Sequence, residues 1–216
     1  MKRGSENKKR HGPRIGEQAD QKQNTDQGRT MEYKLKRLNR ELASRGKVLE
    51  FYRDTMELPD GKIEKWDFVH HTKGGGACVV PVLPDERVLM IHQYRPMNDR
   101  ETTELPAGAF DAEDPDFAVT ASRELEEETG YRCGRIRRLV SLDTAVAWCN
   151  EIVEVCLAQD LEKVSGQKLD EAEEIRVEAI AVEELERMIF AGEIRDAKTV
   201  AGILAYLVVR AKEGGM

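Results

Sequence analysis

Hydrophobic residues are spaced in two ways along this chain: some segments have the spacing of β-strands and others have the spacing of α-helices. Short apolar runs or apolar–polar alternation, typical of strands, occur at residues 47–71, 77–83, 87–94, 136–143 and 151–158. Pro59-Asp60-Gly61-Lys62 is a strong turn signal inside the first range and predicts a hairpin. Gly74-Gly75-Gly76 precedes the second range without the Lys-Ser or Lys-Thr of a phosphate loop, so we expect a flexible entry to a buried strand.

A helix is predicted between residues 114 and 130. Asp114 suits the N-cap, and Pro115 suits the first helical position, where an N–H would have no partner. Gly130 can adopt the left-handed conformation that ends a helix. Apolar residues recur at every fourth position and form one stripe: Phe117, Ala121 and Leu125.

Two further helices close the chain. Residues 182–191 are amphipathic and end at Gly192, with three side chains directed inward: Leu185, Met188 and Ile189. Asp196 caps a last helix that runs to Lys212, and its apolar stripe has four members: Val200, Ile203, Leu204 and Leu207. Strands that frame one central helix, followed by closing helices, predict an α+β fold built as an α/β/α sandwich.

Composition separates a polar tail from the rest of the chain. The 216 residues fit one domain of ordinary size with appendages. Residues 1–30 are almost free of apolar side chains and cannot bury enough surface to offset their ordering entropy, so we expect disorder there. A basic arm for nucleic acid is the alternative, which interspersed acids and a net charge of −7 disfavour. Met31 is a second candidate for the natural start.

The remaining composition favours the cytoplasm. No apolar run approaches the roughly 20 residues of a membrane span, and no signal-peptide pattern is present. The 4 cysteines form no Cys-x-x-Cys pair. Cys78 and Cys156 lie in apolar runs, so we expect buried thiols rather than disulfides or zinc ligands.

Three carboxylates gather on one face of the central helix. At about 100° per residue, Glu124, Glu127 and Glu128 are neighbours, whereas Glu126 points the opposite way. Arg123 lies four residues before Glu127 and can hold that carboxylate. Oxygen ligands of this kind suit a hard divalent ion such as Mg²⁺ or Mn²⁺. A solvated acidic helix face is the alternative interpretation.

The full pattern from Gly108 to Tyr131 decides between these interpretations. It resembles the Nudix box, in which a glycine and a middle glutamate precede Arg-Glu-apolar-x-Glu-Glu-x-Gly-apolar. The second half is matched completely by residues 123–131, and Glu104-Leu105-Pro106-Ala107-Gly108 resembles the entry of the ADP-ribose pyrophosphatase branch. The loop before Arg123 is one residue longer than usual, which places Pro115 where the middle glutamate belongs. The role of that middle carboxylate is therefore open.

The resemblance covers about residues 47–207 and implies the Nudix fold, a mixed sheet between helices. It implies that Glu124, Glu128 and the Ala107 carbonyl hold Mg²⁺ or Mn²⁺, and that Glu127 binds a bridging water or the metal. Residues 169–177 form a second acidic cluster, which would alone be a solvated loop. By resemblance it supplies the general base, with Glu171 as the base and Glu173 as a metal-side ligand, or with the roles exchanged.

Substrate contacts are also implied by the resemblance. Gln93-Tyr94-Arg95 resembles the family segment whose arginine contacts the substrate diphosphate, and Glu104 belongs to the same substrate-binding set. Trp66 is either a base-stacking residue or a buried strand tryptophan. Glu151 matches a glutamate that contacts substrate, although residues 144–151 lack the usual Ser-Pro-Gly turn. Trp148 in that loop is an anchor or a pocket wall.

The function implied is metal-dependent hydrolysis of a nucleoside diphosphate linked to another group, first of all ADP-ribose, to AMP and ribose 5-phosphate. GDP- or UDP-sugars are the nearer alternative because of the altered loop, and a non-catalytic nucleotide-sugar sensor is the remoter one. The predicted organisation is a polar tail at 1–30, a hairpin extension at 31–72 for dimerisation and the adenine pocket, and a Nudix domain at 73–216. A cytoplasmic homodimer without nucleic-acid or membrane partners is expected.

Overall fold

The predicted strands and helices occur in the predicted order, and further strands that no pattern had predicted occur at residues 36–45, 100–104 and 107–109. A computed structural model describes residues 34–169 and 174–214. The strands are β1 (Lys36–Arg45), β2 (Leu49–Glu57), β3 (Ile63–His71), β4 (Gly75–Pro81), β5 (Arg87–Arg95), β6 (Arg100–Glu104), β7 (Ala107–Ala109), β8 (Tyr131–Asp143), β9 (Ile152–Lys163) and β10 (Ile175–Ala181). The helices are α1 (Phe117–Thr129), α2 (Val182–Phe190) and α3 (Ala197–Gly214), with a short 3-10 turn at Pro96–Asn98.

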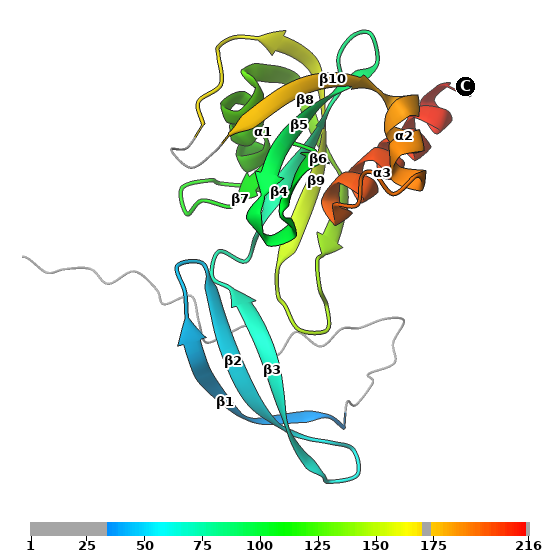
Figure 1. Ribbon diagram of the computed structural model, residues 1–216. Helices are drawn as coiled ribbons and strands as arrows, with labels where there is room; N and C mark the ends of the chain where they lie inside the picture. Colours follow the sequence, from blue (N-terminus) through cyan, green and yellow to red (C-terminus); the bar gives the residue numbers. More distant parts are fainter. Residues whose placement is uncertain (1–33, 170–173, 215–216) are drawn as a thin grey trace, which may run out of the picture.

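The strands form three sheets in the described part of the chain. The largest has the order β7-β4-β9-β8, and its β4–β9 pair is parallel while the β4–β7 and β8–β9 pairs are antiparallel. The second sheet, β10-β5-β6, is antiparallel. The third sheet, β1-β2-β3, lies apart from the other two (Figure 1).

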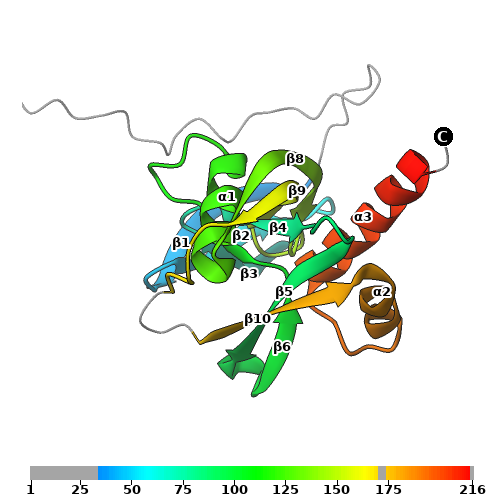
Figure 2. The same ribbon diagram turned by 90° about the horizontal axis from the view of Figure 1, so that it is seen from above.

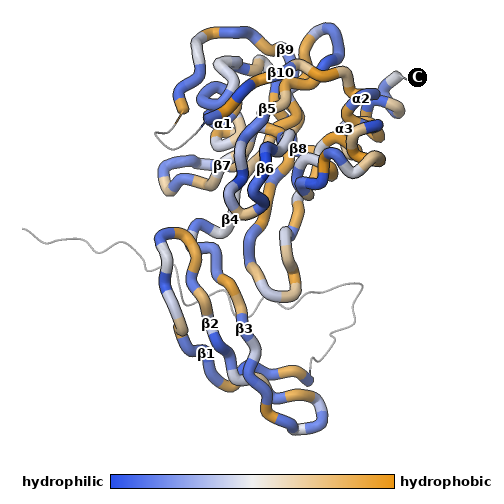
Figure 3. Tube along the Cα trace, in the orientation of Figure 1, coloured by the Kyte–Doolittle hydropathy of each residue, from blue (hydrophilic) through white to orange (hydrophobic). Residues whose placement is uncertain are grey.

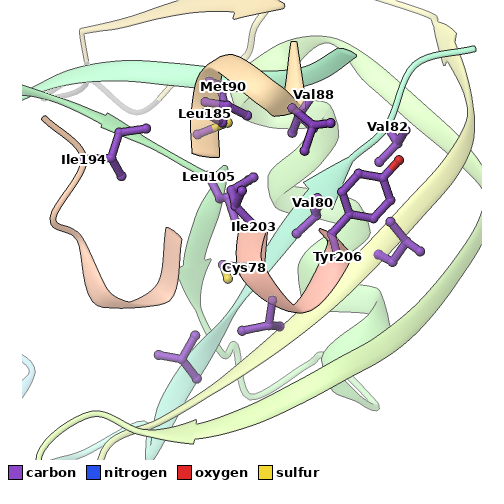
Figure 4. Packing of buried hydrophobic residues seen from close by; sticks show 14 residues of the cluster. Cys78, Val80, Val82, Val88, Met90, Leu105, Leu185, Ile194, Ile203 and Tyr206 are labelled. Carbon is purple, nitrogen blue, oxygen red and sulfur yellow. The ribbon is translucent and has the colours of Figure 1, made fainter. Parts of the chain in front are cut away.

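Helices cover the large sheet on both faces, with α1 on one side and α3 on the other (Figure 2). Side chains along β4 alternate between two cores: Ala77 and Val79 pack toward α1, whereas Cys78 and Val80 pack toward α2 and α3. Figure 4 shows the second core, where Ile203 and Tyr206 of α3 lie among residues of β4, β5 and α2. This is the predicted α/β/α sandwich with a mixed sheet, and the α+β fold class is confirmed.

The separate β1-β2-β3 sheet contains the predicted hairpin and one strand that was not predicted, β1. The turn at residues 59–62 joins β2 to β3, as predicted. All ten positions of β1 are exposed, so the strand has no apolar alternation that could reveal it in the sequence. Its Arg40 side chain donates to Asp54 of β2 at 2.9–3.1 Å, and that carboxylate is fully buried. Figure 3 shows hydrophilic and hydrophobic residues mixed along this sheet.

The loop between β8 and β9 attaches this sheet to the rest of the molecule. The Val69 N–H donates to the Trp148 carbonyl at 2.8 Å, and the His71 N–H donates to the Asn150 side chain at 2.6 Å. Trp148 is therefore an anchor through its backbone, while its half-exposed ring lines a small pocket with Tyr52.

Three details of the predicted elements were wrong. Helix α1 begins after Asp116, whose carboxylate accepts from the Ala118 and Val119 N–H groups, so Asp114 is not the N-cap and Pro115 precedes the helix. Strands β8 and β9 are each longer than predicted. The buried stripe of α3 is Thr199, Gly202, Ile203 and Tyr206, because small and polar residues face the sheet where the predicted Val200, Leu204 and Leu207 are only partly buried.

Other details agree with the prediction. Gly130 has φ +76° and ends α1, and its N–H donates to the Glu126 carbonyl. Ala121 and Leu125 are fully buried and Phe117 packs against them. Asp196 accepts from the Thr199 N–H at 3.0 Å and caps α3. Cys78 and Cys156 are buried free thiols, and burial raises the pKa of each to about 12.

Candidate active site

Helix α1 places two of its glutamates against strand β7. A Cβ atom on Gly108 would lie 2.0 Å from Oε1 of Glu124, so that carboxylate rests directly on the Gly108 backbone. The Ala107 N–H donates to Oε2 of Glu128 at 3.0 Å, and Glu128 is buried. The first glycine of the predicted motif therefore matters for a glutamate of its second half, because a Cβ atom at position 108 would displace the Glu124 carboxylate.

Arg123 organises the acidic residues around it. Its guanidinium donates to Glu124 at 2.7 Å and to Glu127 at 2.9 Å, and it lies 3.4 Å from Asp111. Burial alone would lower the pKa of Arg123, but the Glu124 charge and the hydrogen bonds to carboxylates outweigh this effect and raise it. The predicted Arg123–Glu127 contact is present, and Glu124 shares the same nitrogen.

Asp114 lies one residue before Pro115, which the sequence register aligned with the middle glutamate. Its Oδ2 accepts from the Arg123 guanidinium at 3.2 Å and from the Thr120 hydroxyl at 2.8 Å. Pro115 has no side chain that could make these contacts. The longer loop thus supplies an acidic partner for Arg123.

Glu126 lies on the opposite face of α1, as the helical spacing predicts. It accepts from Arg132 at 2.5 Å and from Lys168 at 2.9 Å. These contacts join the helix to β8 and to the segment before β10. Glu126 has a structural role and is separated from Glu124 and Glu128.

A second charged cluster brings Arg95 and Glu104 together. Glu104 is buried on β6 and accepts two hydrogen bonds from Arg95 of β5, each at 2.7 Å. Lys198 of α3 and the Thr102 hydroxyl donate to the same carboxylate, each at 2.7 Å. Burial alone would raise the pKa of Glu104, but the Arg95 hydrogen bonds and the Lys198 charge lower it to about 2.

Lys198 was missed by sequence reasoning. It also donates to Asp196 at 2.9 Å, while the Leu105 N–H donates to the Thr199 hydroxyl at 2.9 Å. These bonds fix the start of α3 to the segment that leads into Ala107. No spacing could reveal the contact, since 94 residues separate Lys198 from Glu104.

Two pockets meet at Asp196 and Lys198. One, of about 370 Å³, is lined by Ala107, Gly108 and Glu151 together with the start of β4. The other, of about 560 Å³, is lined by Arg95, Glu104 and the 3-10 turn. Glu151 thus lies beside the backbone of the acidic site, whereas Trp66 lies in the separate β1-β2-β3 sheet, half-buried, and lines neither pocket.

The donor set around β7 suits a hard divalent cation. Glu124 and Glu128 offer carboxylate oxygens beside the Ala107–Gly108 backbone. Among residues 34–169 and 174–214, no three His, Cys, Asp or Glu side chains are already gathered around one metal position. An ion that keeps several waters and takes one or two carboxylates plus substrate phosphates fits such an open set, and Mg²⁺ has this preference. Glu171 and Glu173 lie outside the described residues.

Comparison with known proteins settles the family. The NUDIX domain model matches residues 72–202. The chain belongs to the NUDIX domain family. The predicted Nudix fold and hydrolase family are thereby confirmed, and the matched range contains α1, β7 and both charged clusters.

Similar proteins share most of their length with this Nudix chain. An ADP-ribose pyrophosphatase of Bacillus subtilis is 35% identical over 160 residues, which cover 73% of this chain and 84% of the relative. A GDP-mannose pyrophosphatase of Escherichia coli is 29% identical over 157 residues, covering 68% and 81%. A crystal structure described as an ADP compounds hydrolase superposes with a TM-score of 0.75 at 18% identity, covering 85% and 98%, and supports the fold.

Proposed function

We propose that this Nudix hydrolase cleaves ADP-ribose to AMP and ribose 5-phosphate with the aid of Mg²⁺ or Mn²⁺. The observation that carries the proposal is the seating of Glu124 and Glu128 on the Ala107–Gly108 backbone, next to a pocket that contains Glu151. The similarity to the ADP-ribose pyrophosphatase of Bacillus subtilis supports the choice of substrate.

The acidic residues have different roles in this proposal. Glu124, Glu128 and the Ala107 carbonyl hold the divalent ion, with Glu173 as a further ligand. The bound ion supplies charge neutralisation for the diphosphate and activates water. Glu127 orients a water, and Arg123 holds that carboxylate in place through a hydrogen bond at 2.9 Å. Glu171 or Glu173 accepts the proton of the attacking water.

The substrate contacts come from three parts of the chain. Arg95 binds the diphosphate, and the buried Glu104 fixes its guanidinium from behind. Glu151 contacts the substrate from the β8–β9 side. Trp66 stacks on the base, which places the β1-β2-β3 sheet in the adenine site of an assembled dimer.

The nearer alternative is a GDP- or UDP-sugar substrate with the same mechanism. The loop at residues 144–151 lacks the turn expected for ADP-ribose pyrophosphatases, and its Val146 side chain is largely exposed. The similarity to a GDP-mannose pyrophosphatase also favours this alternative. Hydrolysis of a panel of ADP-, GDP- and UDP-linked sugars separates the two.

The proposal extends to organisation and location. Residues 1–30 form a tail, residues 31–72 an extension used for dimerisation and base binding, and residues 73–216 the Nudix domain. None of the described helices has the length and hydrophobicity needed to cross a bilayer. We place the protein in the cytoplasm as a homodimer.

The first experiment measures phosphate released from ADP-ribose by a coupled phosphatase, with Mg²⁺ present. We compare wild type with Glu128→Gln, which removes a charged ligand without changing size. The rate should fall about a thousandfold, because several kcal/mol of transition-state stabilisation are lost. Glu126→Gln on the opposite face of α1 is the matched control and should stay near the wild-type rate.

Three outcomes are informative. Turnover that collapses only in Glu128→Gln supports both substrate and site. Absence of wild-type turnover discards ADP-ribose and directs the assay to GDP- and UDP-sugars. Equal turnover in wild type and Glu128→Gln refutes the metal-site assignment.

A further inference from the structure

The 560 Å³ pocket beside Arg95 carries an excess of positive charge. Its lining contains four cations and two carboxylates: Arg95, Arg100, Arg195, Lys198, Glu104 and Asp196. This leaves two net positive charges in one concave site. Positive charge concentrated in a pocket attracts anions, since the surrounding protein focuses the field.

Two of the arginines face each other across neighbouring strands. Arg95 at the end of β5 is the Cα partner of Arg100 at the start of β6. Like charges directly opposite in an antiparallel pair are destabilising. Glu104 compensates Arg95 through two hydrogen bonds at 2.7 Å, but Arg100 has no such partner in the part of the chain that the structure describes.

Arg100 and Arg195 have no counter-ion among residues 34–169 and 174–214. Neither makes an ion pair or side-chain hydrogen bond with a residue that the structure describes, and Nε of Arg100 is buried without a partner. Arg187 on α2 differs, since it pairs with both Glu184 and Glu193. Two guanidinium groups without an acidic partner among the described residues therefore line one pocket, and together they can neutralise an anion with two negative charges.

The carboxylates of the pocket cannot satisfy these arginines as they stand. Glu104 already accepts from Arg95, Thr102 and Lys198. Asp196 accepts from Lys198 and from both the N–H and the hydroxyl of Thr199. The acidic groups hold Lys198, and Glu104 also holds Arg95, whereas Arg100 and Arg195 line the same pocket without a described acidic partner.

We propose that Arg100 and Arg195 bind a phosphoryl group in this pocket, next to the one that Arg95 holds. This rests on the proposed function, in which Arg95 contacts the diphosphate. Guanidinium groups bind phosphate oxygens in bidentate fashion, and two negative charges, carried by a free monophosphate or by the two phosphoryl groups of the diphosphate together, match the net charge of the site. The group comes either from the diphosphate of the intact substrate or from a free monophosphate, including the product. In both cases these two arginines determine affinity for the phosphorylated end of the ligand.

The test uses the full chain with Arg100→Ala, Arg195→Ala and the charge-conserving Arg100→Lys and Arg195→Lys. We expect the KM for ADP-ribose to rise about tenfold or more in the alanine variants, because a charge-assisted hydrogen bond is lost, with a smaller change in kcat. The lysine variants should recover part of the loss. Arg135→Ala, which removes an exposed arginine of β8, is the control, and thermal unfolding checks that each variant folds.

A second arm measures inorganic phosphate and ribose 5-phosphate as ligands by calorimetry, without turnover. Weakened binding of both in the alanine variants identifies free monophosphate as a source. A raised KM with unchanged monophosphate binding identifies the substrate diphosphate. Alanine variants that match wild type in both arms overturn the proposal. Arginine-dependent phosphate binding in a protein that hydrolyses none of the nucleotide sugars would leave the pocket standing and refute the proposed function.

Discussion

At the scale of single residues, the site depends on a position without a side chain, Gly108, as much as on its charged side chains. Gly108 lies under the Glu124 carboxylate, and Asp114 lies where a one-residue insertion allows it to reach Arg123. Glu104 is the most heavily bonded carboxylate of the second cluster. Each of these contacts leads to a measurement.

Gly108→Ala is expected to impair catalysis more than folding. The added Cβ would lie 2.0 Å from Glu124 Oε1, which is the end of a flexible side chain and can move aside. A displacement of about 1 Å in a catalytic group can cost about a hundredfold in rate, so we expect a loss of about that size in kcat. Gly166→Ala, where a Cβ has nothing within 4 Å, is the control. A Gly108→Ala enzyme with wild-type kcat would contradict the placement of Glu124.

The Glu104 carboxylate should make stability depend on pH. Its pKa in the folded protein is lowered from 4.5 to about 2, so its contribution is present above about pH 5 and is lost as the pH falls toward 2. From the size of the shift, this contribution is about 3 kcal/mol. Urea unfolding of wild type and Glu104→Gln at pH 7, 5, 4 and 3 should show a difference that shrinks with acidity. A difference that stays constant over this range would refute the assignment, and Glu186→Gln on the exposed side of α2 serves as the control.

At the scale of elements, helix α1 carries the carboxylates and is held at both ends. Asp116 accepts two N–H groups at its start, and Gly130 ends it in the left-handed conformation. Between these ends, Ala121 and Leu125 pack on the sheet and fix the rotation of the helix. That rotation directs Glu124 and Glu128 to β7.

Asp116→Ala should lower the free energy of unfolding by about 1 kcal/mol, because two N–H groups of the first turn lose their acceptor. Asp116→Asn should be close to neutral, since asparagine is an equally good N-cap. The measurement is chemical denaturation monitored by circular dichroism. Because Asp116 precedes the first turn of α1, whereas Glu124 and Glu128 lie in its second half, kcat should stay near the wild-type value in both variants. Loss of activity in Asp116→Asn would show that the residue has another role.

At the scale of the whole molecule, the β1-β2-β3 sheet stands apart and is joined to the sandwich mainly through the β8–β9 loop (Figure 1). Strand β1 is an edge strand, and Leu38 and Leu42 on it are exposed. Exposed edges with apolar side chains are common sites of association. This supports the proposed homodimer through residues 31–72.

Sedimentation velocity tests the assembly. We expect the wild-type chain to sediment as a dimer and the Leu38→Glu/Leu42→Glu variant to shift toward monomer, because two charges would be buried on association. Phe190→Glu, at an exposed position on α2, should remain dimeric. A monomeric wild-type chain would refute the assembly.

The sequence by itself determined the fold class, the central helix with its stop at Gly130, and the face that holds Glu124, Glu127 and Glu128. These features depend on the spacing of apolar residues along the chain and on the ability of glycine to adopt the left-handed conformation. Both can be read from residues that are close together in the sequence. Short-range spacing also gave the Arg123–Glu127 contact. The Nudix assignment followed from the same residues and was confirmed.

Only the tertiary structure decided the rest. Asp114 contacts Arg123 because the longer loop brings it there, and register counting cannot follow the path of a loop. Lys198 met Glu104 across 94 residues, and Arg100 met Arg95 through strand pairing, so neither contact had a local signal. Strand β1 had no apolar face to reveal it, since it is stabilised by backbone pairing and by ion pairs to Asp54. Contacts between residues that lie far apart in the chain leave no periodic pattern, so they could not be predicted from a single sequence.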